Sequence, residues 1–192
     1  MFVFKGFNRF VGRGVRMFLV LAVCWGGFVS CSSELTAEGA LEQIAAQAEF
    51  RMPYYAPMRI GEVVLTGDNH KDSKGYIRKH YGPLIDAGLA EVAVADRNTW
   101  RTVIDVRLSE KARAMVDGGR STEREAYVPV CRMAPVRIDE FRTLSEEGIV
   151  ECAFTFEERD ITPFGLCKGF QQGREYKDKR TFVKARGSWH VK

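Results

Sequence analysis

Sequence patterns that mark the common enzyme classes are missing from this chain of 192 residues. It has no HExxH zinc motif, no GxSxG nucleophile elbow and no glycine-rich phosphate loop, because no lysine follows Gly118-Gly119. Histidine is scarce, with three copies at His70, His80 and His190. A nucleophilic site needs a thiol or hydroxyl beside a base and an orienting group. The sequence therefore favours a protein that is not an enzyme and that holds no cofactor.

A calcium loop of the EF-hand type is also missing, although residues 68–72 are polar enough to suggest a metal site. Such a loop needs glycine at its sixth position for a sharp turn and glutamate at its twelfth for bidentate coordination. Counted from Asp68, these positions hold Ser73 and Lys79. We therefore expect an exposed turn here, over residues 66–69, and no metal ligands.

The apolar run near the N-terminus is too short to cross a bilayer. Residues 17–29 give 13 apolar positions and include Gly26 and Gly27, whereas a membrane-spanning helix needs about 20 residues. Before this run, residues 1–16 carry four basic side chains and no acidic one. A basic segment followed by a short apolar run is typical of an export signal. An ordinary secretory signal and an uncleaved anchor helix remain as alternatives.

A cysteine ends this region, in the sequence Phe28-Val29-Ser30-Cys31. The stretch resembles the lipobox of bacterial lipoprotein precursors, although Phe28 stands where that family usually has leucine. The resemblance implies that residues 1–30 are a signal peptide and that Cys31 is lipidated and becomes the mature N-terminus. Residues 31–36 would then form a lipidated tether. Stable anchoring needs more than one acyl chain, and the tri-acylated cysteine of this family meets that condition.

The same resemblance implies a location and two partners. A lipidated, exported protein belongs to the cell envelope, where Cys31 attaches it to a lipid bilayer. In a cell with two membranes, Ser32 after the cysteine implies the outer membrane, with the protein facing the periplasm. We expect the second partner to be another envelope protein.

The net charge gives no support for nucleic-acid binding once the signal is set aside. The chain has 29 basic and 25 acidic residues, and four of the basic residues lie in the predicted signal. The mature chain is therefore neutral, with 25 residues of each sign. Proteins that bind nucleic acids through phosphates carry an excess of basic side chains. We expect no nucleic-acid partner.

Basic residues are concentrated near the C-terminus. Residues 168–192 contain eight lysines and arginines but only two acidic residues. This charge run is typical of a solvated hairpin face, or else of a patch that binds an anionic partner such as a membrane surface or an acidic protein. The residues of this candidate patch are Lys177, Lys179, Arg180, Lys184 and Arg186.

Three cysteines follow Cys31, namely Cys131, Cys152 and Cys167. Export permits disulfides, and an odd number leaves one thiol over. A bridge between Cys152 and Cys167 would close the hairpin that begins near Cys152, so this pair is the candidate disulfide. Three buried free thiols are the alternative.

The pattern of apolar residues predicts an α+β fold. A helix is expected over residues 36–50, and strands over residues 60–65, 126–133, 136–141 and 149–157, with Pro129 placing the second of these at a sheet edge. Within the last strand, residues 150, 152, 154 and 156 should share a buried face. We expect an α/β lobe over residues 37–119 and an antiparallel β lobe over residues 120–192.

The stretch 74–116 contains a predicted helix ending near Gly88, a hairpin over residues 89–108 and a short helix from Glu110. This order resembles the end of a winged-helix domain. Its helix carries only Lys74, Arg78 and Lys79 as phosphate contacts, so we expect a packing and interaction module and no DNA binding.

Together these observations predict a membrane-anchored envelope lipoprotein whose body is a non-catalytic binding or structural module. Two other hypotheses remain open. The first is a periplasmic enzyme that uses a cysteine with a histidine, and a hydrogen bond between His80 or His190 and Cys131 or Cys167 in a cleft would support it. The second is an immunity protein that blocks a toxin, and a concave face that is either acidic or basic would support it.

Overall fold

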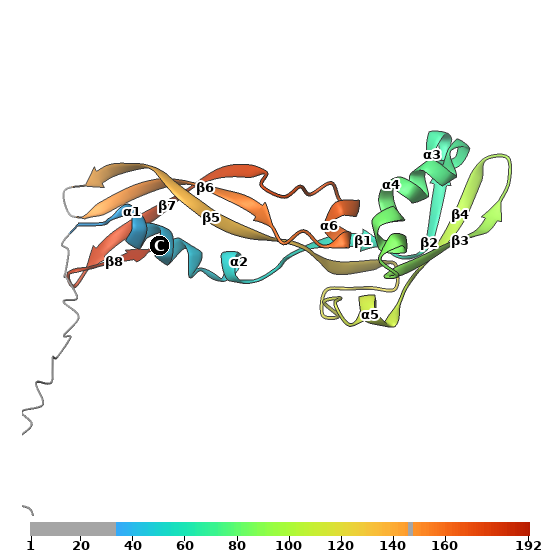
Figure 1. The fold of residues 1–192 in the computed structure, drawn as a ribbon, viewed down its shortest axis with the longest axis horizontal. Coiled ribbons are helices and arrows are strands. Elements are labelled where there is room, and N and C mark those ends of the chain that lie inside the picture. The colour runs from blue at the N-terminus through green and yellow to red at the C-terminus, as the bar shows by residue number, and fades with distance from the viewer. Residues whose placement is uncertain (1–33, 146–147) are drawn as a thin grey trace, which may run out of the picture. The chain divides into compact units, whose positions relative to one another are not determined.

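A computed structural model describes residues 34–145 and 148–192 of the chain. Helices and antiparallel strands make up these residues, which confirms the predicted α+β class (Figure 1). The predicted signal peptide and Cys31 lie outside the described residues, as does the first half of the predicted tether. Among the described helices, none combines the length and the apolar character needed to span a membrane.

The larger of two sheets has five strands in the order β1-β5-β6-β7-β8, and each neighbouring pair is antiparallel. The strands are β1 (Tyr54–Arg59), β5 (Glu125–Ser145), β6 (Ile149–Arg159), β7 (Glu175–Ala185) and β8 (Ser188–Val191). The predicted C-terminal antiparallel sheet is therefore confirmed. The sequence did not predict β1, which extends this sheet at one edge.

Strand β5 changes partners along its length, which accounts for the two separate strands that the sequence predicted. Its first part, residues 125–131, pairs with β1, and residues 132–145 pair with β6. Pro129 lies in the part that pairs with β1, so its missing N–H removes no hydrogen bond to β6. Its carbonyl accepts a hydrogen bond of 2.6 Å from the hydroxyl of Thr162. A register shift at Pro135 then lets the same strand continue past the second proline.

Two short helices pack on the five-stranded sheet. The first, α1 (Ala37–Ala45), begins at Thr36, whose hydroxyl accepts a hydrogen bond from the Gly39 amide at 3.1 Å. The second, α2 (Ala48–Arg51), follows after a break of two residues, so the predicted N-terminal helix is present but interrupted. The apolar residues of these helices pack against apolar residues of the sheet, and we call this group the helix–sheet cluster. Its buried members are Ala40, Ile44, Phe50, Cys152, Phe154 and Phe182.

The smaller sheet has three strands in the order β2-β4-β3. They are β2 (Gly61–Thr66), β3 (Ala90–Arg97) and β4 (Arg101–Leu108), and β2 is joined to β3 through α3 (Gly67–Lys71) and α4 (Ser73–Asp86). The predicted helix and hairpin are thus confirmed, and Gly88 follows α4 with a φ of 64° that suits glycine. Helix α3 replaces the predicted turn at residues 66–69. The resemblance to a winged-helix domain remains a prediction.

A second apolar cluster, the central cluster, joins the two sheets. It is completed by α6 (Pro163–Cys167) and α5 (Glu110–Arg113). Fully buried members include Leu84, Ile104, Ala112, Val128, Val130 and Phe164. Residues on both sides of position 119 share this cluster, while α1, α2 and β1 pack with the C-terminal sheet. The described residues on both sides of the predicted boundary between residues 119 and 120 belong to one compact unit, and the division into two lobes stays a prediction.

Candidate functional site

An open groove of about 440 Å³ lies beside the helix–sheet cluster. We call it the aromatic groove, because five of its nine lining residues are aromatic. It is built from α2, β1, β5, β6 and β7 and from the loop that follows α6. The lining residues are Glu49, Phe50, Tyr54, Met133, Phe156, Phe170, Tyr176, Asp178 and Arg180. Ligand pockets of proteins have volumes of about 300–1,000 Å³ and mainly apolar walls, so this groove has the size and lining of a binding site.

The aromatic rings of the groove support one another. Phe156 stacks on Tyr176 with their ring centroids 5.4 Å apart, and the edge of Phe50 meets Phe156 at 5.8 Å. Tyr54 lies 6.0 Å from Phe170 in a tilted arrangement. Such pairs contribute about 0.5–1.5 kcal/mol each beyond their area burial. The walls are therefore held in place without a ligand.

Arg180 is the charged centre of the groove rim. Its guanidinium donates hydrogen bonds to Glu49 on α2 and to Asp178 on β7, and its Nε donates to Gln47 at 3.2 Å. Burial alone would lower the pKa of Arg180, but the bonds to Glu49 and Asp178 outweigh burial and raise it. Two carboxylates against one guanidinium leave the rim with one excess negative charge.

A buried carboxyl group holds the loop that forms one wall of the groove. Glu158, fully buried on β6, accepts hydrogen bonds from the backbone N–H of Gln171 and from the hydroxyl of Tyr176. The hydroxyl bond to Glu158 raises the pKa of Tyr176, because it stabilises the protonated phenol. Arg174 lies further away, with its Nη1 3.9 Å from the carboxyl. Glu158 therefore positions the loop between Phe170 and Tyr176.

The candidate basic patch on the C-terminal strand is divided between two faces of the sheet. Alternation along β7 places Lys177 and Lys179 on one face, and Arg180 and Lys184 on the face that carries the helix–sheet cluster. Arg186 lies beyond the strand, in the turn to β8. Lys179 pairs with Glu151 at 2.8 Å, and Lys184 lies over the ring of Trp189. The five residues therefore do not form one continuous surface.

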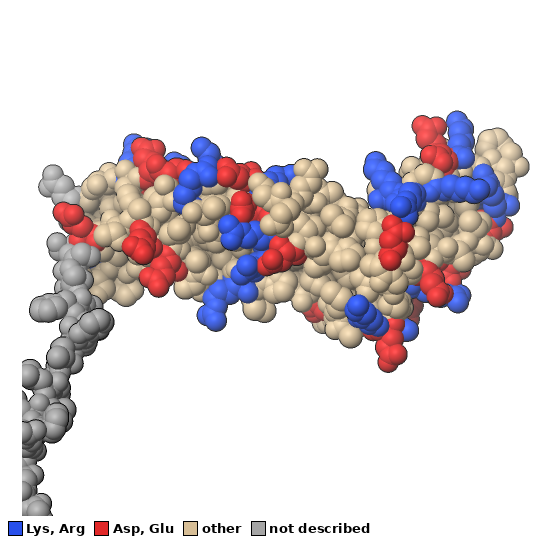
Figure 2. All heavy atoms as spheres, viewed as in Figure 1, with Lys and Arg blue, Asp and Glu red and all other residues tan. Residues whose placement is uncertain are grey.

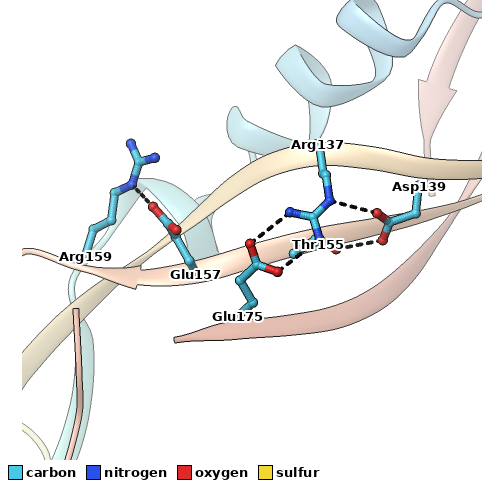
Figure 3. Close-up of polar contacts among 6 residues, drawn as sticks. All are labelled: Arg137, Asp139, Thr155, Glu157, Arg159 and Glu175. Carbon is cyan, nitrogen blue, oxygen red and sulfur yellow. Dashed lines mark hydrogen bonds and ion pairs between the residues drawn. The ribbon is translucent and has the colours of Figure 1, made fainter. Parts of the chain in front are cut away.

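The face of the sheet that carries Lys177 and Lys179 also holds several ion pairs, and Figure 3 shows those that Arg137 forms with Asp139 and Glu175. Arg137 donates two parallel hydrogen bonds of 2.8 and 2.9 Å to the carboxylate of Glu175, and its Nε donates to Asp139 at 3.1 Å. The hydroxyl of Thr155 donates to the other oxygen of Asp139 at 2.7 Å. Figure 2 likewise shows basic and acidic side chains interspersed over the visible surface.

The candidate disulfide is not formed, and the structure corrects that prediction. Cys131, Cys152 and Cys167 are free, buried thiols. Cys152 belongs to the helix–sheet cluster, whereas Cys167 on α6 belongs to the central cluster, so the two are packed into different parts of the core. The hairpin from β6 to β7 is closed by main-chain pairing instead, with Cys152 opposite Arg180.

The structure brings one histidine near one cysteine without coupling them. His80 and Cys167 line the same small pocket, but the described residues include no hydrogen bond between them. Burial raises the pKa of the Cys167 thiol, which disfavours the reactive thiolate. His190 lies on β8, opposite Val183 of β7. His70 contacts the hydroxyl of Thr102 through Nδ1 at 2.8 Å.

No protein-family model, no curated protein and no solved structure matches this chain. The groove and its chemistry therefore carry the functional interpretation. Among the described residues, no group of three or more histidine, cysteine or acidic side chains is placed to hold a metal ion.

Most groove residues were not singled out by the sequence. The sequence singled out Arg180 as part of the basic patch, and it placed Phe156 on a buried strand face. The remaining lining residues come from segments as far apart as Glu49 and Asp178, and no local pattern joins them. The aromatic residues Tyr54 and Tyr176 near the starts of strands, and Phe170 in the loop before β7, were the one available signal.

Proposed function

We propose that this protein is an envelope lipoprotein, anchored through a lipid on Cys31, whose folded body binds another envelope protein through the aromatic groove. The anchoring rests on the basic and apolar residues 1–30 and on the lipobox resemblance. The binding role rests on one observation above all. A preformed, open groove lined by five aromatic side chains and a charged rim lies on a body in which no described cysteine is hydrogen-bonded to a histidine.

The chemistry of the groove selects a segment that combines an apolar or aromatic side chain with a positive charge. The aromatic walls provide apolar area and ring faces that attract cations. The rim provides the excess carboxylate, because Arg180 can neutralise only one of Glu49 and Asp178. An exposed apolar segment that carries a lysine or arginine therefore fits the groove better than an acidic segment does.

The anchoring is tested by metabolic labelling. Labelled palmitate should enter the full chain and fail to enter the Cys31→Ala variant, and membrane fractionation should move the variant from the membrane to the soluble fraction. In a cell with two membranes the labelled protein should sediment with the outer membrane. An unlabelled, soluble wild-type protein would contradict the anchoring but would leave the groove proposal standing.

The groove is tested with synthetic pentapeptides that contain two leucines, one phenylalanine and either two lysines or two glutamates. Binding is followed by NMR shift changes in the full chain in detergent. The lysine peptide should shift the signals of Tyr54, Phe170 and Tyr176, and the glutamate peptide should bind more weakly. Phe170→Ala should weaken binding, whereas Trp100→Ala should not, because Trp100 is exposed and distant from the groove lining. Equal binding of both peptides would refute the charge preference.

The two other hypotheses have less support. An enzyme would need a thiolate beside a base, yet burial raises the pKa of all three described thiols. A toxin-immunity protein would favour a concave face of one charge, whereas the aromatic groove is mainly apolar and its rim is mixed in sign.

A further inference from the structure

A second pocket lies where β1, α4 and α6 meet, and it has a volume of about 220 Å³. We call it the basic pocket, because three of its seven lining residues are basic and none is acidic. Arg59, His80 and Lys168 surround it at the surface, while the buried side chains of Met58 and Tyr81 form its inner part. Tyr76 and Cys167 complete the lining.

The cations of this pocket have no carboxylate partner. Nine arginines among the described residues form ion pairs with acidic side chains. Within the same residues, no ion pair involves Arg59 or Lys168, and none involves Lys79, which precedes His80. Glu62 and Glu125 line a neighbouring depression on the other side of Arg59, but neither comes within ion-pair distance of it. Among the described residues, the positive charge of this pocket is therefore not neutralised by an ion pair.

No negative charge arises inside the pocket near neutral pH. The Tyr81 hydroxyl donates a hydrogen bond of 3.2 Å to the carbonyl oxygen of Arg59, and burial raises the pKa of Tyr81 further above the physiological range. Burial also raises the pKa of the Cys167 thiol. Both groups therefore remain neutral, and the field in the pocket is set by its basic residues.

The walls of the pocket are fixed by contacts that do not involve the side chains of Arg59 and Lys168. The ring of Tyr76 packs against the ring of His80, with centroids 4.3 Å apart, and both stand on α4. The Tyr81 hydrogen bond ties α4 to the end of β1, next to Arg59. Lys168 follows directly after α6, which packs against α4. Three elements therefore hold their basic side chains around one small space.

We propose that the basic pocket binds a phosphate group through Arg59, Lys168 and His80. Arginine presents paired N–H donors that match two oxygens of a phosphate, and lysine adds a compact point charge. The small volume admits a phosphate group and little more, so the rest of a larger ligand would extend outwards. This site is independent of the aromatic groove, and it does not depend on the proposed function.

The experiment distinguishes two sources of the phosphate group, the free ion and the diester of a lipid headgroup. Inorganic phosphate and dimethyl phosphate separate them, because the second carries the single charge and the two ester groups of a phospholipid. Each is titrated into the full chain in detergent by calorimetry, with chloride held constant. Stronger binding of inorganic phosphate assigns the site to the free ion, and comparable binding of dimethyl phosphate assigns it to a headgroup.

Three variants decide whether the pocket is responsible. Arg59→Gln and Lys168→Gln should each weaken phosphate binding by about tenfold or more, the usual effect of removing a hydrogen bond to a charged group. Lys111→Gln on α5 is the matched control, since Lys111 is exposed and lies outside the pocket. The amide NMR spectrum of each variant checks that the fold is kept. Binding that is absent, or that is the same in all four proteins, overturns the proposal.

The pH dependence of binding gives an independent readout. His80 faces Tyr76 and Lys79 on α4, Cys167 and Lys168 at α6, and Arg59 on β1. Burial, helped by Lys79 and Lys168, lowers the pKa of His80 in the empty pocket. A bound dianion favours the imidazolium, so binding takes up a proton and tightens as the pH falls towards that lowered pKa.

Sulfate is the probe for this experiment, because its charge does not change over the pH range used. Sulfate affinity should rise from pH 8 to pH 6 in the wild type, with a downfield shift of the His80 ring signals, and His80→Gln should abolish the rise. A rise of equal size in His80→Gln would place the titrating group elsewhere and contradict the role given to His80.

Discussion

Removing the carboxyl group of Glu158 should destabilise the protein more than removing any other described acidic side chain. This carboxyl is fully buried and accepts hydrogen bonds from the Gln171 amide and the Tyr176 hydroxyl. Hydrogen bonds to a charged group contribute about 1.5–3 kcal/mol each. Water can reach Gln171 and Tyr176 once the carboxyl is gone, because neither residue is fully buried. Glu158→Ala should therefore lower the free energy of unfolding by about 3 kcal/mol, the lower end of the summed range.

A graded series tests the origin of this loss. Glu158→Gln can still accept from Gln171 and can donate to the Tyr176 oxygen, so it loses the charge but keeps two partners. Because charge-assisted bonds are roughly twice as strong as neutral ones, about half of the loss is expected. Glu175→Gln is the control, since Glu175 is exposed and its ion pair with Arg137 is screened by solvent, so a much smaller loss is expected.

Urea unfolding followed by circular dichroism measures all three variants, with the midpoint and the slope fitted separately. Hydrogen exchange at the Gln171 and Gly173 amides should accelerate in Glu158→Ala, because the Glu158 main chain and side chain both hold that loop. An unfolding midpoint of Glu158→Ala equal to that of the wild type, or to that of Glu175→Gln, would refute the reasoning. Weakened peptide binding to the groove should accompany the loosened loop.

Three further measurements have expected results. Phe154→Ala removes a fully buried ring from the helix–sheet cluster and should cost about 3–5 kcal/mol of unfolding free energy in urea. Gly165→Ala places a Cβ 2.1 Å from the Val130 carbonyl oxygen and should lower thermal stability, whereas Gly118→Ala meets nothing within 4 Å and should not. Burial, with a smaller contribution from Glu158, raises the pKa of Cys131 to about 11, so a thiol reagent at pH 8 should react with Cys131 only after unfolding. The folded protein keeps this thiol protonated up to about pH 11, whereas the unfolded chain loses the proton near pH 9. The thiol's contribution to the free energy of unfolding is therefore fully present below about pH 9 and is lost as the pH rises towards 11.

Local signals predicted the elements whose boundaries depend on short-range chemistry. The helix that ends before Gly88 and the hairpin after it were found because periodicity and turn residues act over a few positions. The buried face of β6 was also found, and Cys152 and Phe154 are fully buried on it. α3 was missed because residues 67–71 have the composition of a turn, yet they form one short helix leading into α4.

Long-range pairing explains the remaining differences. β1 contains Pro57 and follows Pro53, so the sequence indicated only the end of a helix there. It is an edge strand, where a proline is tolerated, and its partner is β5, about seventy residues later in the chain. The aromatic groove depends on that same pairing, because it brings Tyr54 towards Met133 and Phe170. No pattern within a short window could have located the groove.

The packing of α1 has a consequence for when this protein can finish folding. Ile44 and Leu35, at the start of the described chain, pack with Phe182, Trp189 and Val191 near its end. A chain that leaves a ribosome or a membrane pore N-terminus first must therefore wait for its final residues before this helix finds its partners.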